Sequence, residues 1–103
     1  MNTHENYRII FNNDNSNNIF AISKLINYLE ERFKNNEEIT INFSSIQYNS
    51  DEDRITSKNT EVSFKVNVSS SISSEKFKTE LNKIIEEIKT HYAIDKILVR
   101  KID

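Results

Sequence analysis

The sequence predicts an α+β fold, a two-layer sandwich whose strands and helices follow one another in the order β-α-β-β-α-β. Segments in which apolar and polar residues alternate are typical of half-buried strands, and they flank segments in which apolar residues recur every three to four positions, as on one face of a helix. The chain has 103 residues, a length typical of one domain with one core. We therefore expect a single domain over residues 1–103.

The first strand and the first helix are predicted over residues 6–11 and 18–34. Tyr7, Ile9 and Phe11 alternate with Arg8, which favours a strand. An Asn-rich turn follows, with Asn18 placed to cap the helix. The helix is predicted from one apolar stripe, made of Ile19, Ile22, Leu25, Ile26, Leu29 and Phe33. Because the chain contains no glycine, we expect the left-handed residue that ends this helix at Asn35-Asn36.

The second strand is predicted to contain a bulge. Ile39, Ile41 and Phe43 alternate with polar residues, but the apolar set then resumes at Ile46 and Tyr48, so its parity changes across Ser44-Ser45. One extra residue in the strand would return both sets to the same face of the sheet. The polar segment 49–60 is predicted to be a hairpin loop.

The second half of the chain contains the clearest strand. Val62, Phe64, Val66 and Val68 alternate with polar residues, and the run Ser69-Ser70-Ser71 follows. Ser73 or Ser74 is placed to cap a helix over residues 74–92, with Glu75 at its positive end. Its apolar stripe consists of Phe77, Leu81, Ile84, Ile85, Ile88 and Tyr92. The last strand is predicted over residues 95–102.

This order of elements resembles the ferredoxin-like superfold, and the resemblance covers the whole chain but rests on no motif. It implies a four-stranded antiparallel sheet in the order 4-1-3-2, with both helices on one face. The alternating pattern independently predicts one buried and one solvated face. Because this fold carries many unrelated functions, the resemblance itself says little about what the protein does.

The composition argues against several kinds of catalytic site. The chain has no cysteine and no glycine, so it lacks thiolate ligands and nucleophiles as well as the glycine-rich loops that bind phosphates. Its two histidines, His4 and His91, are predicted in a frayed terminus and in the last turn of a helix. Asp51, Glu52 and Asp53 lack the spacing of a calcium loop and are interpreted as a solvated loop tip. We expect no catalytic residues, no metal and no cofactor.

The net charge of −2 and the polar first residues bear on the location of the protein. Met1 to Tyr7 shows no secretory signal, and no apolar run is long enough to span a bilayer. We expect a cytoplasmic protein without membrane contacts. The heavy use of Asn, Ile and Lys indicates an AT-rich genome, compatible with a phage or a mobile element.

The solvated face of the sheet is the candidate binding surface. If Ile9, Ile41, Phe64 and Val99 point to the helices, parity assigns the alternate residues to the other face. There, Ile10, Leu98 and Ile102 would form an apolar centre with cations around it, an arrangement typical of protein interfaces. The partner-binding residues predicted in this way are Arg8, Ile10, Lys65, Lys96, Leu98 and Arg100. The competing interpretation is a polar face that is merely solvated.

The favoured hypothesis is a non-catalytic module that binds another protein, as a stoichiometric inhibitor, an immunity protein or an accessory protein. The alternative is a nucleic-acid-binding protein that uses the same cations, although the aromatic residues of the central strands share parity with the core and leave no stacking platform. The second strand is also predicted at a sheet edge without Lys, Arg or Pro, so a homodimer through the sheet edge or the sheet face is a further hypothesis.

Overall fold

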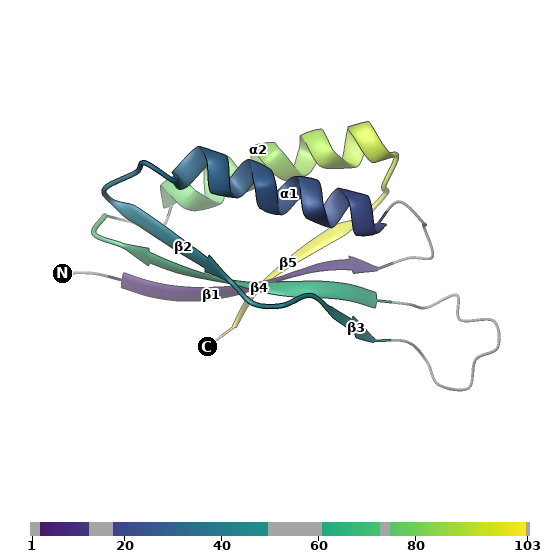
Figure 1. The fold of residues 1–103 in the computed structure, drawn as a ribbon, viewed down its shortest axis with the longest axis horizontal. Helices are drawn as coiled ribbons and strands as arrows, with labels where there is room; N and C mark the ends of the chain where they lie inside the picture. Colours follow the sequence, from purple (N-terminus) through teal and green to yellow (C-terminus); the bar gives the residue numbers. More distant parts are fainter. Residues whose placement is uncertain (1–2, 13–17, 50–60, 73–74, 103) are drawn as a thin grey trace.

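The computed structural model describes residues 3–12, 18–49, 61–72 and 75–102 and confirms the predicted fold class. Its elements are β1 (Thr3–Asn12), α1 (Asn18–Phe33), β2 (Ile39–Phe43), β3 (Gln47–Asn49), β4 (Glu61–Ser70), α2 (Glu75–Tyr92) and β5 (Ile97–Ile102). The antiparallel sheet has the order β2-β4-β1-β5, and β3 continues the edge formed by β2 along β4 (Figure 1). This is the predicted order read from the other edge, in a ferredoxin-like arrangement.

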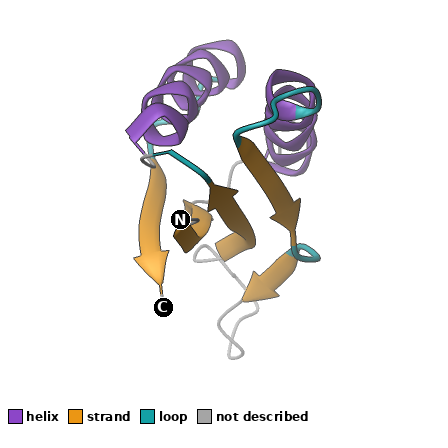
Figure 2. Ribbon diagram, turned by 90° about the vertical axis from the view of Figure 1, so that its left-hand side faces the viewer, coloured by secondary structure: helices purple, strands orange, loops and turns teal. Residues whose placement is uncertain are grey.

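Both helices cover the same face of the sheet and leave the opposite face open (Figure 2). The core lies between these two layers. It receives alternate residues of β1 and β4, namely Tyr7, Ile9, Phe11, Val62, Phe64, Val66 and Val68, all at most 4% exposed. Helix α2 contributes the stripe Phe77, Leu81, Ile84, Ile85 and Ile88. Alternate strand residues and the apolar faces of the helices therefore form one core. Burial in this core determines which side of the sheet each strand residue faces.

Helix α1 packs along a slightly different line from the predicted stripe. Ala21 is fully buried, although the pattern did not single it out, whereas Ile19 is 41% exposed and Ile26 only half-buried. Ile19 and Ile26 are seven residues apart and so lie on one side of the helix. The buried line is formed by Ala21, Ile22, Leu25, Leu29 and Phe33. Helix α1 thus has a partly apolar flank, on which Ile26 packs at the margin of the core and Ile19 is exposed.

The predicted bulge is present between β2 and β3. Phe43 pairs with Val66 and Gln47 with Ser63, so the edge strand advances four residues while β4 advances three. The edge strand and β4 stay hydrogen-bonded across the bulge. The Ser44 N–H donates to the Lys65 carbonyl at 2.9 Å, and the Lys65 N–H donates to Ser44 Oγ at 2.8 Å. The extra residue returns Ile46 to the helix side, where it packs against the core.

The end of α1 differs from the prediction of a left-handed residue at Asn35-Asn36. Among the described residues, only Ala93 has positive φ, at 53°, directly after α2. At the end of α1, the Asn36 N–H instead donates to the Phe33 carbonyl at 3.1 Å. The Asn36 side chain then accepts the N–H groups of both Glu38 and Ile39 at 2.8 Å. Asn36 is therefore a side-chain cap for the start of β2 and needs no left-handed backbone.

Replacing Asn36 with alanine is expected to lower the free energy of unfolding by about 1 kcal/mol, because two main-chain donors lose their acceptor. The change Asn36→Asp keeps an acceptor oxygen and serves as the control, with stability close to that of the wild type. Urea unfolding monitored by circular dichroism measures both. Equal stability of the alanine variant and the wild type would show that water replaces the side-chain oxygen without loss.

Candidate protein-binding face of the sheet

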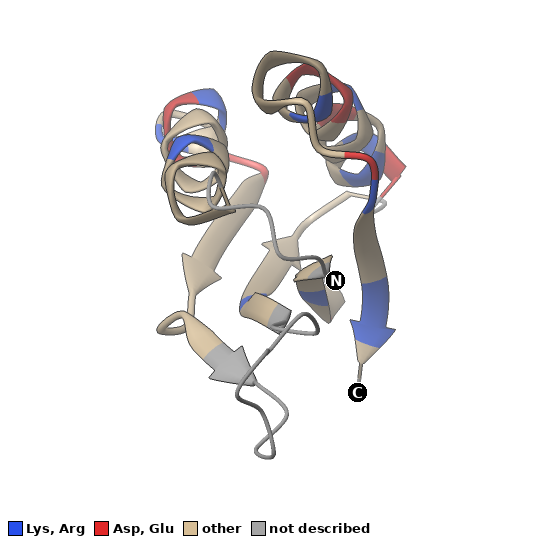
Figure 3. Ribbon diagram, turned by 90° about the vertical axis from the view of Figure 1, so that its right-hand side faces the viewer, with Lys and Arg blue, Asp and Glu red and all other residues tan. Residues whose placement is uncertain are grey.

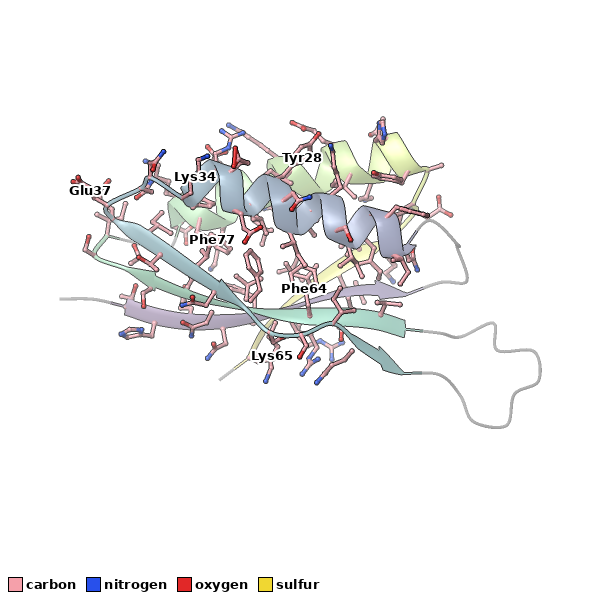
Figure 4. The ribbon with its side chains drawn as sticks, viewed as in Figure 1. Tyr28, Lys34, Glu37, Phe64, Lys65 and Phe77 are labelled. Atoms are coloured by element: carbon pink, nitrogen blue, oxygen red, sulfur yellow. The ribbon has the colours of Figure 1, made fainter. Side chains whose placement is uncertain are left out.

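The strand register assigns the residues of the open face. Arg8 of β1 is opposite Lys65 of β4 on one side and opposite Arg100 of β5 on the other. Because directly opposite residues point to the same side of a sheet, these three cations share one face. Phe64, next to Lys65, points between the layers, whereas Lys65 points away from the helices (Figure 4). The predicted parity of the strands is therefore present in the structure.

Lys65, Arg8 and Arg100 form a continuous row across three strands, which we call the cation row. Opposite side chains on neighbouring strands have Cβ atoms about 4.5–5.5 Å apart, so like charges in such a row repel one another. Arg8 donates to Gln47 Oε1 and to Ser63 Oγ, both at 3.1 Å and both neutral. Within the described parts of the chain, no carboxylate forms an ion pair with any member of the row. The fold therefore holds three neighbouring positive charges without a counter-charge among these residues.

Other charged side chains are neutralised more locally. Lys101 lies opposite Tyr7 and thus on the helix side, where its ammonium is 2.9 Å from the Glu5 carboxylate. On the helices, lysines and glutamates three residues apart form ion pairs, and Arg32 of α1 pairs with Glu80 of α2. Figure 3 shows acidic and basic residues interleaved along both helices. This contrast makes the cation row an unusual feature of a chain whose net charge is negative.

A row of amide side chains lies beside the cation row. Asn42, Asn67 and Asn6 are opposite one another on β2, β4 and β1, and Ile102 of β5 completes this row. The Asn67 side chain donates to Asn6 Oδ1 at 2.7 Å. Together with Lys65, these residues line a shallow hollow of about 320 Å³. The amides can donate and accept hydrogen bonds, so the hollow can bind polar main-chain groups next to the cations.

The predicted apolar centre of the face is not formed. Ile10 lies on the expected side of the sheet but is only 3% exposed, so it belongs to the buried residues. It is flanked in its own row by Ser63 and Leu98, and the Arg8 side chain reaches over to Ser63. Leu98 and Ile102 remain half-buried, but Arg100 lies between them on β5. Parity gives the side of a residue, whereas its exposure also depends on how its longer neighbours fold over it.

The remaining predictions for this face have mixed outcomes. Lys96 is exposed but precedes β5, so strand pairing does not fix it on the face. The side chain of Glu61 lies outside the described residues, as do Ser73, Ser74 and the loop with Asp51, Glu52 and Asp53. The prediction for His4 was wrong. It lies within β1, is opposite Ser69, and its Nδ1 is 2.8 Å from Ser69 Oγ, because β1 begins at Thr3.

His91 does not lie in an enclosed site. It lines a hollow of about 140 Å³ between the helices together with Glu87, and both side chains are exposed. A general base is usually set up by burial and an oriented partner, which exposed groups in a small open hollow do not provide. The described residues also contain no group of three or more His, Asp or Glu side chains placed to hold a metal ion. None of the described helices is long and apolar enough to cross a membrane.

Comparisons with known proteins support the fold. No protein-family model and no curated protein matches the sequence. Among solved structures, a putative amidohydrolase/peptidase from Burkholderia cenocepacia is similar with a TM-score of 0.72 and 8% identity. A dinuclear metal binding peptidase of the M20 family from Bacillus subtilis is similar with a TM-score of 0.66 and 12% identity. Identities this low establish similarity of fold alone.

The matched region is nearly all of this chain but only a part of the two bacterial proteins. Each match covers 99% of this chain, but only 28% of the Burkholderia protein and 26% of the Bacillus protein. The chain thus spans about a quarter of the length of these two hydrolases. The de novo designed protein Foldit4 is covered over 98% of its length, with a TM-score of 0.55 and 14% identity. The same arrangement therefore occurs both as a part of larger enzymes and as almost all of a small protein.

Proposed function

We propose that the protein is a non-catalytic module that binds an acidic surface of another protein with the open face of its sheet. The observation that carries this proposal is the cation row of Lys65, Arg8 and Arg100, which has no counter-charge among the described residues. A partner with carboxylates opposite the row would remove the repulsion between its members and gain charge-assisted hydrogen bonds. An accessory protein, an immunity protein or a stoichiometric inhibitor could each bind its partner through such a face.

The rest of the face favours a protein over a nucleic acid as the partner. Bases of single strands usually stack on exposed aromatic side chains of a sheet. Here Tyr7 and Phe64 of the two central strands are 2% and 0% exposed and face the helices. Amides and half-buried aliphatic residues lie beside the cations instead, a mixture typical of protein interfaces. The similarity to parts of larger hydrolases is compatible with an accessory role.

The test reverses the two exposed ends of the cation row, with Lys65→Glu and Arg100→Glu in one variant. This variant places opposite charges on both sides of Arg8, so we expect it to be as stable as the wild type or a few degrees more stable. We expect its affinity for the partner to fall at least about tenfold, because each lost attraction becomes a repulsion. Thermal unfolding and pull-down from a lysate of the source cells measure the two effects separately.

The matched control carries Lys76→Glu and Lys83→Glu, which change the net charge equally but lie exposed on α2. We expect the wild type and this control to retain the same protein, and the sheet-face variant to lose it. The captured protein is then purified and titrated, and its affinity should weaken as salt is raised. Equal capture by all three chains would refute the proposed face. Capture that nuclease treatment abolishes would instead support the nucleic-acid alternative.

A further inference from the structure

The outer edge of β2 carries main-chain groups whose direction can be deduced from two hydrogen bonds. The Ser71 N–H donates to the Glu38 carbonyl at 3.0 Å, and the Ser44 N–H donates to the Lys65 carbonyl at 2.9 Å. In an antiparallel pair such bonds occur at every second residue, so the even-numbered residues of β2 face β4. The N–H and C=O groups of Ile39, Ile41 and Phe43 therefore point outward from the sheet.

One of these outward groups already has a partner, which limits what can pair with the edge. The Ile39 N–H donates to Asn36 Oδ1 at 2.8 Å. The Ile39 carbonyl and both main-chain groups of Ile41 and Phe43 remain directed away from β4. The segment from Ile39 to Ile46 contains no charged residue and no proline, so it lacks the usual protection of an edge strand against pairing. The edge is thus a short, neutral template for another strand.

A groove runs along this edge, between β2 and α1, which lie next to each other in Figure 1. Its volume is about 760 Å³, and Ile26, Ile41, Phe43 and Ile46 line it with partly buried apolar side chains. Glu30 and Lys34 of α1 also line it, so its charges cancel. A strand added to β2 would direct every second side chain into this groove, as in recognition by strand addition.

We propose that the occupant of this edge is a second copy of the chain, paired through β2 in antiparallel orientation about a two-fold axis at Ile41. Each Ile41 would then donate to and accept from the other Ile41, and each Phe43 N–H would donate to the other copy's Ile39 carbonyl. This pattern uses four of the five outward groups that remain and leaves the Asn36 cap intact. The fifth, the Phe43 carbonyl, stays open to water, because the Ile39 N–H opposite it is bound to Asn36. The two Ile41 side chains meet on the helix side and cover each other in the grooves.

Charge distinguishes this surface from the open face and favours a second copy as its occupant. Two copies of the cation row would repel each other, so the open face does not suit self-association. The neutral edge has no such penalty. The bulge at Ser44 ends the regular edge after Phe43, which restricts pairing to a short segment centred on Ile41. A two-fold contact of this kind closes on itself and forms dimers, not fibres. This inference concerns a surface separate from the proposed partner-binding face.

The test places a charge at the two-fold axis. The wild type should show a mass that rises from 12.2 kDa toward twice that value as its concentration increases in sedimentation equilibrium. The variants Ile41→Lys and Ile41→Glu should each dissociate at least about tenfold more readily, because like charges meet across the axis. A mixture of the two variants should dimerise again, since opposite charges then meet. This rescue also shows that both variants are folded.

The matched control is Thr40→Lys, which adds the same charge one residue earlier, on the open face of the sheet and so outside the groove in which the two Ile41 side chains meet. We expect it to dimerise as the wild type does. A wild type that remains monomeric at every concentration would overturn the proposal. So would a dimer that Ile41→Lys does not weaken, or a mixture of the two variants that stays monomeric.

Discussion

Replacing Phe77 with alanine is expected to lower the free energy of unfolding by about 3–5 kcal/mol. Phe77 is fully buried in α2, and its ring centroid is 5.6 Å from those of both Tyr7 in β1 and Phe33 in α1. It therefore joins both helices to the sheet. The change leaves a cavity where three elements meet, and aromatic contacts of this kind add to the effect of lost apolar burial.

Chemical denaturation of the two chains measures this loss, and Lys76→Ala is the matched control. Lys76 is the preceding residue of the same helix and is exposed, so its replacement should change the stability by no more than about 0.5 kcal/mol. Domains of this size are usually stable by about 5–15 kcal/mol, so Phe77→Ala removes a large part of the total. Similar stabilities of the two variants would mean that the three elements do not share one core.

Exchanging Phe64 and Lys65, by Phe64→Lys and Lys65→Phe in one chain, is expected to prevent folding. The exchange changes neither composition, net charge nor length, but it reverses which residue faces the helices. An ammonium group would then replace a fully buried ring without a partner, and a phenyl ring would lie on the open face (Figure 4). An unpaired buried charge costs several kcal/mol in addition to the lost packing of the ring. Far-ultraviolet circular dichroism should show no cooperative unfolding transition.

The control for this exchange keeps parity. Lys65→Asn combined with Asn67→Lys swaps two residues that both face away from the helices. We expect that chain to fold, with a stability within about 1 kcal/mol of the wild type, because surface substitutions of this kind change little. If the chain with Phe64 and Lys65 exchanged folds, the register of β4 can slip by one residue. The cation row would then not be assigned to one face of the sheet.

These two experiments test the part of the fold that was predictable from the sequence. The alternation from Val62 to Val68 fixed which face of β4 is buried, and the change of parity across Ser44-Ser45 located the bulge. Both predictions depend on the strict two-residue period of a strand. A helix period leaves more freedom, and α1 accordingly turned Ile19 outward and Ala21 inward. Which of the apolar residues on one side of a helix become buried is decided by packing against the sheet. The sequence of the helix alone does not contain that information.

The candidate site was predictable only in part, for a similar reason. Arg8, Lys65 and Arg100 were placed on one face by parity, but their alignment in one row depends on the register between strands distant in sequence. The burial of Ile10, which is 3% exposed, depends on side-chain packing between neighbouring strands, and parity does not contain that packing. The groove beside β2 arises from the distance between a helix and an edge strand. The sequence did indicate an edge strand without charges. The groove itself could not be predicted, because its lining residues come together only in the folded structure.

The central position of β1 has a consequence for the synthesis of the chain. β1 ends at Asn12, yet its two neighbours in the sheet are β4, which ends at Ser70, and β5, which ends at Ile102. At about 5–20 residues per second, a ribosome would leave this strand without partners for several seconds. Pairing between segments so distant in sequence also slows folding, because a long loop must close first. The nascent chain therefore exposes Tyr7, Ile9 and Phe11 early, at a stage when chaperones can bind them.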